Sequence, residues 1–204
     1  MDSHRLFAIV PAAGLSRRMG RPKLLLPLGG RSLIVRLLDA LNRPDISGCF
    51  VVVRGDDASL CAEVLAAGGE VIAPEIDPPD MRTSVQHALD EIRTRFAPGP
   101  EDGWLLIPAD HPVLDEELLD LLIDCWERND DLILVPTYQN RRGHPTFFRW
   151  KLSDEVAGLP PDRGLNTLLE TYRDEVVEFP VDHPGVVTDL DTPDDYDRLQ
   201  REWE

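Results

Sequence analysis

Short apolar runs alternate with longer amphipathic stretches along most of the chain. The apolar runs hold four to six residues, are rich in Val, Ile, Leu and Phe, and are continuous rather than alternating. Continuous runs are typical of strands whose two sheet faces are both covered. They predict five buried strands, at residues 6–10, 48–53, 70–73, 104–107 and 132–135.

Helical periodicity fills the segments between these strands. The apolar positions Val85, Ala88, Leu89 and Ile92, for example, fall on one face of a helix expected over residues 81–96. Further helices are predicted at residues 32–41, 57–67 and 115–128. Strand and helix therefore alternate up to about residue 136, which indicates a doubly wound, mostly parallel α/β sheet of Rossmann-like type.

The pattern loosens after Pro136, where shorter elements are expected. Short strands are predicted at residues 146–148, 176–179 and 185–187, and helices at residues 151–157, 164–172 and 193–203. We find no internal repeat and no low-complexity linker. The economical prediction is a single domain over residues 1–204, with a small β-rich portion at about 137–188.

Composition and charge narrow the classes of function. The chain has 204 residues, 42% hydrophobic and 29% charged, which is typical of a globular protein. Its net charge of −17 disfavours binding to nucleic acid or to an anionic membrane surface. Its apolar runs are too short for a membrane span, it opens with no secretory leader pattern, and its three cysteines lack C-x-x-C spacing. We therefore expect a cytoplasmic protein with reduced thiols.

The charge is unevenly distributed along the chain. Seven basic residues and no acidic residue lie between Ser3 and Leu38. One interpretation is a chance segregation of solvated side chains. The other is a local anion site that attracts a compact polyanion such as a nucleoside triphosphate.

The loop after the first strand carries the chemistry that such a site needs. Ligands of open α/β sheets bind beyond the carboxyl ends of the strands. Ala12, Ala13 and Gly14 leave room for backbone N–H groups to approach phosphate oxygens, and Arg18 and Lys23 add positive charge. An ordinary glycine-containing loop with solvated arginines is the alternative. Neither G-x-x-x-x-G-K-[ST] nor G-x-G-x-x-G is present in the loop.

The same loop resembles the signature of the MobA-like nucleotidyltransferases, and within them most closely that of the molybdenum cofactor cytidylyltransferases. The matching residues are Ala12-Ala13-Gly14-x-Ser16-x-Arg18-Met19-Gly20-x-x-Lys23-x-Leu-Leu-Pro27. Four shorter segments resemble the family in the expected order: Asp80-Met81-x-x-Ser84, Pro108-Ala-Asp110-x-Pro112, Gly143-His144-Pro145 and Asp189-x-Asp191-Thr-Pro-x-Asp195. The resemblance spans nearly the whole chain.

The resemblance implies a Mg²⁺-dependent enzyme that transfers a nucleotidyl group from a nucleoside triphosphate to a phosphate-bearing small molecule and releases pyrophosphate. In the most similar branch the nucleotide is CTP and the acceptor is a molybdopterin-type cofactor. A molybdoenzyme or its maturation factor is the protein partner that such a product implies. Residues 1–136 would bind the nucleotide, residues 137–188 the acceptor, and residues 189–204 would close the site.

The resemblance also assigns roles to individual residues. Arg18 and Lys23 would be catalytic, and His144 would bind the acceptor. Asp110 and Asp191 would hold Mg²⁺, which takes one or two protein carboxylates and substrate phosphate oxygens. The nucleotide would be bound by Ala12, Ala13, Gly14, Ser16, Arg18, Lys23, Ser84 and Asp110.

Structural alternatives exist for three of these segments. Asp110 could cap the helix that follows it, and His144 could hydrogen-bond within its turn. Thr192 and Pro193 are also typical of a helix N-cap followed by its first residue.

Alternatives at the level of function remain open as well. Ala13 is similar to the cytidylyl branch, whereas the guanylyl branch tends to have glycine there, and this difference favours CTP. GTP, a sugar phosphate or another phosphate acceptor are the alternatives within the same chemistry. A nucleotide or cofactor carrier without catalysis is the alternative outside it, because Pro11, Ala109 and Pro161 depart from the family pattern.

Overall fold

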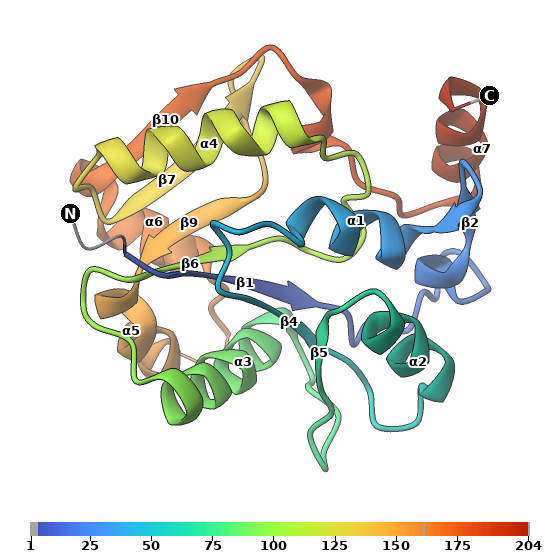
Figure 1. Ribbon diagram of the computed structural model, residues 1–204, viewed down its shortest axis with the longest axis horizontal. Helices are drawn as coiled ribbons and strands as arrows, with labels where there is room; N and C mark the ends of the chain where they lie inside the picture. The colour runs from blue at the N-terminus through green and yellow to red at the C-terminus, as the bar shows by residue number, and fades with distance from the viewer. Residues whose placement is uncertain (1–3, 161, 204) are drawn as a thin grey trace.

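The computed structural model describes residues 4–160 and 162–203, and its centre is a single mostly parallel sheet (Figure 1). Within the described residues this sheet has eight strands, in the order β10-β7-β9-β6-β1-β4-β5 with β8 paired to β7. The strands are β1 (Leu6–Pro11), β4 (Gly48–Val52), β5 (Glu70–Ile72), β6 (Gly103–Leu106), β7 (Ile133–Tyr138), β8 (Arg141–Arg142), β9 (Thr146–Arg149) and β10 (Val176–Pro180).

Parallel pairing dominates, as the alternation of elements predicts. β1 pairs in parallel with β4 and β6, β4 pairs with β5, and β10 pairs with β7. β9 runs antiparallel to its neighbours β6 and β7, and β8 runs antiparallel to β7. The prediction of a doubly wound, mostly parallel sheet is therefore confirmed.

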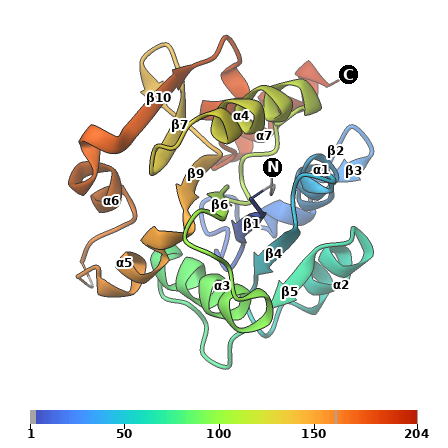
Figure 2. The same ribbon diagram turned by 60° about the vertical axis from the view of Figure 1, so that its left-hand side comes forward.

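Helices cover both faces of this sheet (Figures 1 and 2). One face packs against α1 (Leu33–Leu41), α2 (Ala58–Ala66) and α4 (Glu116–Arg128). The other packs against α3 (Met81–Phe96), α5 (Ser153–Gly158) and α6 (Asn166–Thr171). Successive β1 residues enter opposite cores: Leu6, Ala8 and Val10 face the first, and Phe7 and Ile9 face the second. This explains why the strand is apolar at every position.

The carboxyl-terminal helix α7 (Pro193–Glu202) lies beside the segment that follows β1, although the two are far apart in the sequence. That segment contains a 3-10 turn at Lys23–Leu25 and a hairpin of β2 (Pro27–Leu28) and β3 (Arg31–Ser32). A separate apolar cluster joins them, formed by Met19, Leu28, Leu33, Leu190, Tyr196 and Leu199. The Tyr196 hydroxyl donates a hydrogen bond to the Pro27 carbonyl.

The secondary structure at residues 185–187 differs from the sequence prediction. They were predicted as a strand, but they belong to a 3-10 turn over Pro184–Val187. Gly185 lies so close to the backbone that an added Cβ would be 2.0 Å from the Val113 carbonyl oxygen. An apolar run of three residues carries too little periodicity to separate a buried turn from a strand. The very short strands β2, β3 and β8 left no signal in the sequence for the same reason.

Among the helices of the described residues, none has the length and apolar character needed to cross a membrane.

Asp102 and Arg5 form an ion pair near the amino-terminal edge of the sheet. The Asp102 carboxylate accepts from the Arg5 backbone N–H (2.8 Å), from two Arg5 guanidinium nitrogens (3.1 and 2.7 Å) and from the Gly99 N–H (2.9 Å). Burial alone would raise the pKa of Asp102, but the hydrogen bonds from Arg5 and Gly99 outweigh it and hold the pKa below its usual range. A lowered folded-state pKa stabilises the protein above the unfolded-state pKa, and that stability is lost as the pH falls.

We therefore expect Asp102→Asn to lower the free energy of unfolding at neutral pH by about 1–3 kcal/mol, because buried donors lose their carboxylate. The difference from wild type should shrink below about pH 4, as the wild-type carboxyl takes up its proton. Urea unfolding at several pH values measures this difference. Asp182→Asn is the control, because Asp182 is exposed and its substitution removes the same charge. If the loss of unfolding free energy in Asp102→Asn did not change with pH, the stabilising role of the Asp102 carboxylate would be wrong.

Candidate functional site

The loop after β1 begins at the carboxyl edge of the sheet and turns back on itself. The Ala12 N–H donates to the Val52 carbonyl at 2.8 Å, which ties the start of the loop to β4. Ser16 has a φ of 48° and accepts from the Met19 and Gly20 N–H groups through its carbonyl. Its hydroxyl oxygen lies 3.3 Å from the Lys23 backbone N–H. The folded loop therefore places the Lys23 side chain beside the end of β6.

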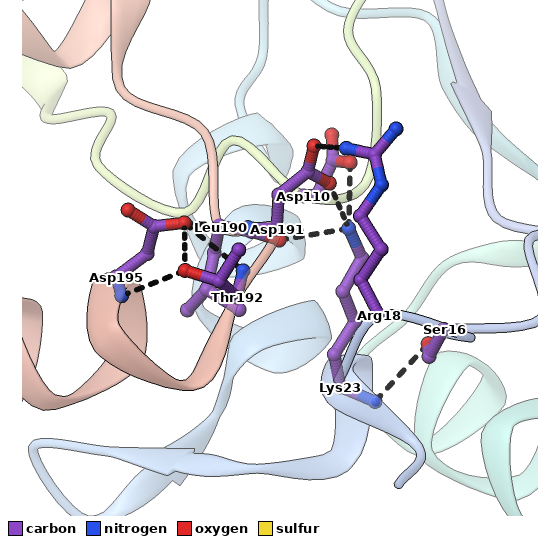
Figure 3. Close-up of polar contacts among 8 residues, drawn as sticks. All are labelled: Ser16, Arg18, Lys23, Asp110, Leu190, Asp191, Thr192 and Asp195. Carbon is purple, nitrogen blue, oxygen red and sulfur yellow. Dashed lines mark hydrogen bonds and ion pairs between the residues drawn. The ribbon is translucent and has the colours of Figure 1, made fainter. Parts of the chain in front are cut away.

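Lys23 is the centre of a network of charges (Figure 3). Its Nζ donates to Asp110 Oδ2 at 2.8 Å, to Asp191 Oδ1 at 3.1 Å and to the Leu190 carbonyl at 2.7 Å. The Lys23 side chain is only 14% exposed, so these contacts are partly shielded from water. The exposed Arg18 guanidinium pairs with the other oxygen of Asp191.

The backbone holds the two carboxylates toward Lys23. Asp110 follows β6, and its carbonyl accepts from the Leu190 N–H at 2.9 Å, which joins the two loops. The N–H groups of Asp191 and Thr192 lie 3.3 and 2.9 Å from Asp195 Oδ2.

Two of the structural alternatives are thereby decided. Thr192 and Asp195 form a capping box at the start of α7, as predicted for Thr192 and Pro193. The interpretation of Asp110 as a helix cap is wrong, because Asp115 caps α4 and accepts from the Leu118 N–H. The Asp110 side chain is therefore left facing Lys23.

A cavity of about 500 Å³ opens beside this network. Its lining comes from the loop after β1, the start of α3, the end of β6 and the loop before α7. It brings together every residue for which the sequence predicts nucleotide or metal binding: Ala12, Ala13, Gly14, Ser16, Arg18, Lys23, Ser84, Asp110 and Asp191. Apart from its two chain neighbours, no described residue comes within 4 Å of the position that a Cβ would take at Gly14, so the loop is open to the cavity there.

The start of α3 forms another wall of the cavity. Asp80 caps this helix by accepting from the Thr83 N–H at 2.7 Å. The buried Ser84 hydroxyl donates to the Asp80 carbonyl at 3.2 Å, so its proton is engaged while its oxygen can still accept a hydrogen bond. Sequence reasoning missed Leu15, Pro78 and Pro79, which also line the cavity. Each of them lies within or just before a matched motif in the sequence, and this position could have identified them as cavity residues.

His144 lies outside the cavity lining, at the end of β6 and next to His111. The two rings meet edge to face, with centroids 4.9 Å apart, and His144 Nδ1 is 3.3 Å from the Leu106 carbonyl oxygen. Burial and the neighbouring His111 lower the pKa of His144 to about 4. Burial also lowers the pKa of His111. Both imidazoles are therefore neutral at neutral pH, and the predicted role of His144 in acceptor binding stays a prediction.

Two departures from the family pattern contact each other. The Ala109 N–H donates to the Pro11 carbonyl at 3.3 Å, so the ends of β1 and β6 remain joined. Pro11 still pairs with Val52 in the register of β1 and β4, and the proline has not broken the strand. The third departure, Pro161, lies outside the described residues.

The carboxylate oxygens that surround the Lys23 ammonium are also ligands that a hard divalent cation prefers. Asp110 and Asp191 already share one cationic partner, the Lys23 ammonium. In the described parts of the chain, no group of three or more His, Cys, Asp or Glu side chains could hold a metal by itself. Asp110 and Asp191 would therefore bind Mg²⁺ or Mn²⁺ only together with substrate oxygens and water, which complete the coordination shell of the metal.

Comparison with known proteins points to one family. The model of the MobA-like NTP transferase domain matches residues 8–178. The molybdenum cofactor guanylyltransferase of Rhizobium meliloti is 28% identical over 187 residues, which cover 88% of this chain and 82% of that protein. The 2-C-methyl-D-erythritol 4-phosphate cytidylyltransferase of Shewanella oneidensis is 31% identical over 59% of this chain and 47% of that protein.

Solved structures with a similar fold cover nearly the whole chain. Rv0371c from Mycobacterium tuberculosis H37Rv superposes with a TM-score of 0.80 at 29% identity, covering 97% of this chain and 98% of that one. Its complex with manganese has a TM-score of 0.75 at 28% identity, covering 96% and 98%.

Proposed function

We propose the substrates of this chain, which belongs to the MobA-like NTP transferase family and is a nucleotidyltransferase. It transfers CMP from CTP to a phosphate-bearing acceptor, a molybdopterin-type cofactor, with Mg²⁺. The observation that carries the proposal is the meeting of Lys23, Asp110 and Asp191 at the wall of the cavity. Three segments separated by more than eighty residues supply them. The site therefore offers positive charge for a triphosphate and carboxylates for a cation.

Each residue then has a definite task. Backbone N–H groups of Ala13 and Gly14 would bind phosphate oxygens, while Arg18 and Lys23 neutralise their charge. Asp110 and Asp191 would hold Mg²⁺, which when bound supplies charge neutralisation at the phosphates. An oxygen of the acceptor phosphate forms the new bond to the α-phosphorus, and the bond to the departing pyrophosphate breaks. No covalent nucleophile from the protein is needed.

In this proposal, different parts of the chain bind the nucleotide and the acceptor. The cavity lining comes from residues between Pro11 and Asp110, with Asp191 added from the segment before α7. We assign nucleotide binding to residues 1–136 and closure of the site to residues 189–204. Acceptor binding falls to residues 137–188, with His144 at the boundary of the two parts.

CTP is proposed on the basis of Ala13, which matches the cytidylyl branch of the family. GTP with the same acceptor is the second candidate, and the guanylyltransferase of Rhizobium meliloti favours it. In either case a molybdoenzyme or its maturation factor would be the protein that receives the product. The two candidates differ in which nucleotide binds.

A thermal-shift comparison of CTP, GTP, UTP, ATP and dTTP, each with Mg²⁺, tests the proposed nucleotide. CTP at about 100 times its Kd should stabilise the protein by about 2.7 kcal/mol, which raises the melting temperature by several degrees. Asp110→Ala should remove this stabilisation. A selective shift with GTP would keep the chemistry and change the substrate, and no shift with any nucleotide would contradict the proposal.

Pyrophosphate release then identifies the acceptor. Wild-type protein, CTP and Mg²⁺ are incubated with molybdenum cofactor or with 2-C-methyl-D-erythritol 4-phosphate. We expect release with molybdenum cofactor. Release only with the sugar phosphate would overturn the proposed acceptor, and release with neither compound would contradict it as well.

A further inference from the structure

The Lys23 ammonium lies between the two carboxylates that we propose as metal ligands. It is bound to both of them, at 2.8 Å from Asp110 Oδ2 and 3.1 Å from Asp191 Oδ1. Its third donor is used by the Leu190 carbonyl at 2.7 Å. An ammonium has three N–H donors, so all of its hydrogen-bonding capacity is spent inside the protein. Lys23 therefore has no donor left for a phosphate in this arrangement.

The charges of the cluster also balance without a ligand. Arg18 and Lys23 carry two positive charges and Asp110 and Asp191 carry two negative charges, and each cation contacts at least one of the carboxylates. A divalent cation added alone would leave this cluster with an excess of two positive charges. A divalent cation added together with a triphosphate would not, because the phosphates bring negative charge with them.

We propose that Lys23 serves as an internal counter-cation that occupies the carboxylates when no nucleotide is bound, and that it moves to the phosphates when a metal-bound triphosphate enters. The inference rests on the proposed role of Asp110 and Asp191 as metal ligands. Lys23 exchanges two carboxylate partners for phosphate oxygens in this step, and no covalent bond changes. Its consequence is that metal binds weakly to the free protein, and that metal and nucleotide strengthen each other's binding reciprocally.

Binding of Mn²⁺ in the absence of nucleotide tests this directly. Free Mn²⁺ is counted by electron paramagnetic resonance for wild type, Lys23→Met, Lys23→Gln and Lys23→Arg. Removing the ammonium should tighten Mn²⁺ binding by about tenfold or more in Lys23→Met and Lys23→Gln, because the cation no longer competes for the carboxylates. Lys23→Arg keeps the competing charge and should bind Mn²⁺ as weakly as wild type.

Lys151→Met is the matched control, because Lys151 is the other lysine of the chain and pairs with Glu101 at 3.9 Å, away from the cavity lining. It removes the same charge and should leave Mn²⁺ affinity unchanged. Adding Asp110→Asn to Lys23→Met should abolish the gain in affinity. Circular dichroism establishes that each variant is folded, and Lys23→Gln provides a second neutral side chain if Lys23→Met does not fold.

The outcomes separate this inference from the proposed function. If Lys23→Met and Lys23→Gln bind Mn²⁺ no more tightly than wild type while CTP still stabilises the wild-type protein, the counter-cation role is wrong and the proposed function stands. If Lys151→Met gains as much affinity as Lys23→Met, the effect is one of net charge and the role is again wrong. If wild type binds neither Mn²⁺ nor any nucleotide, the proposed function fails and the inference fails with it.

Discussion

Replacing Asp110 with asparagine is expected to lower kcat/KM for nucleotidyl transfer by about 10²- to 10³-fold, because the site loses a carboxylate that would hold Mg²⁺ at the reacting phosphates. The side chain is partly exposed and lies against Lys23 rather than inside the apolar cores. The substitution keeps its size, and we expect the melting temperature to change little. Initial rates of pyrophosphate release, with and without the acceptor, measure the effect.

Asp189→Asn is the control for this experiment. Asp189 is exposed and lies two residues from Asp191 in the loop before α7, so it carries the same charge close to the site. It does not line the cavity, and its substitution should leave most of the activity. Near-normal turnover of the Asp110 variant, or an equal loss in both variants, would contradict the proposed role of Asp110.

The largest effect on stability is expected from Trp104→Ala, which should lower the free energy of unfolding by about 3–5 kcal/mol. Trp104 is fully buried in β6, and its ring stacks on Phe148 of β9 with centroids 4.2 Å apart and an interplanar angle of 12°. Removing the ring leaves a cavity where β6 and β9 meet, in the strand that precedes Asp110. Urea unfolding of the purified protein measures the loss.

Two further variants at tryptophan positions sharpen this test. Trp104→Phe should cost less than Trp104→Ala, because a ring remains and the indole N–H has no hydrogen-bond partner among the described residues. Trp203→Ala should cost about 0.5–1 kcal/mol, since that ring is 40% exposed and stacks against the Arg36 guanidinium. Equal losses at Trp104 and Trp203 would show that burial of Trp104 does not control stability.

Elements with strong local patterns were predictable from the sequence. The helix expected over residues 81–96 coincides with α3, because its apolar face and its Asp80 cap are both local features. The five buried strands expected before residue 136 also form, with small differences at their ends. The order of the strands in the sheet was not predictable, because it depends on β9 inserting antiparallel between β6 and β7.

The candidate site was predictable only as separate pieces. The motif of residues 12–27 identified Arg18 and Lys23, and shorter motifs identified Asp110 and Asp191. Their contact, the backbone bond between Leu190 and Asp110, and the use of the Leu190 carbonyl by Lys23 were not visible. A backbone carbonyl carries no residue-specific signal, and the partners are more than eighty positions apart.

Local order and composition were enough to predict the alternating α/β class, the basic loop on an acidic chain and the residues that bear charge. The folded chain was needed to show that one ammonium holds two carboxylates at the wall of a cavity, that Asp110 does not cap a helix, and that His144 packs against His111. Charge pairing and burial depend on distance in space. Packing of the sheet and of α7 brings these residues together, and neighbouring positions in the sequence do not encode that distance.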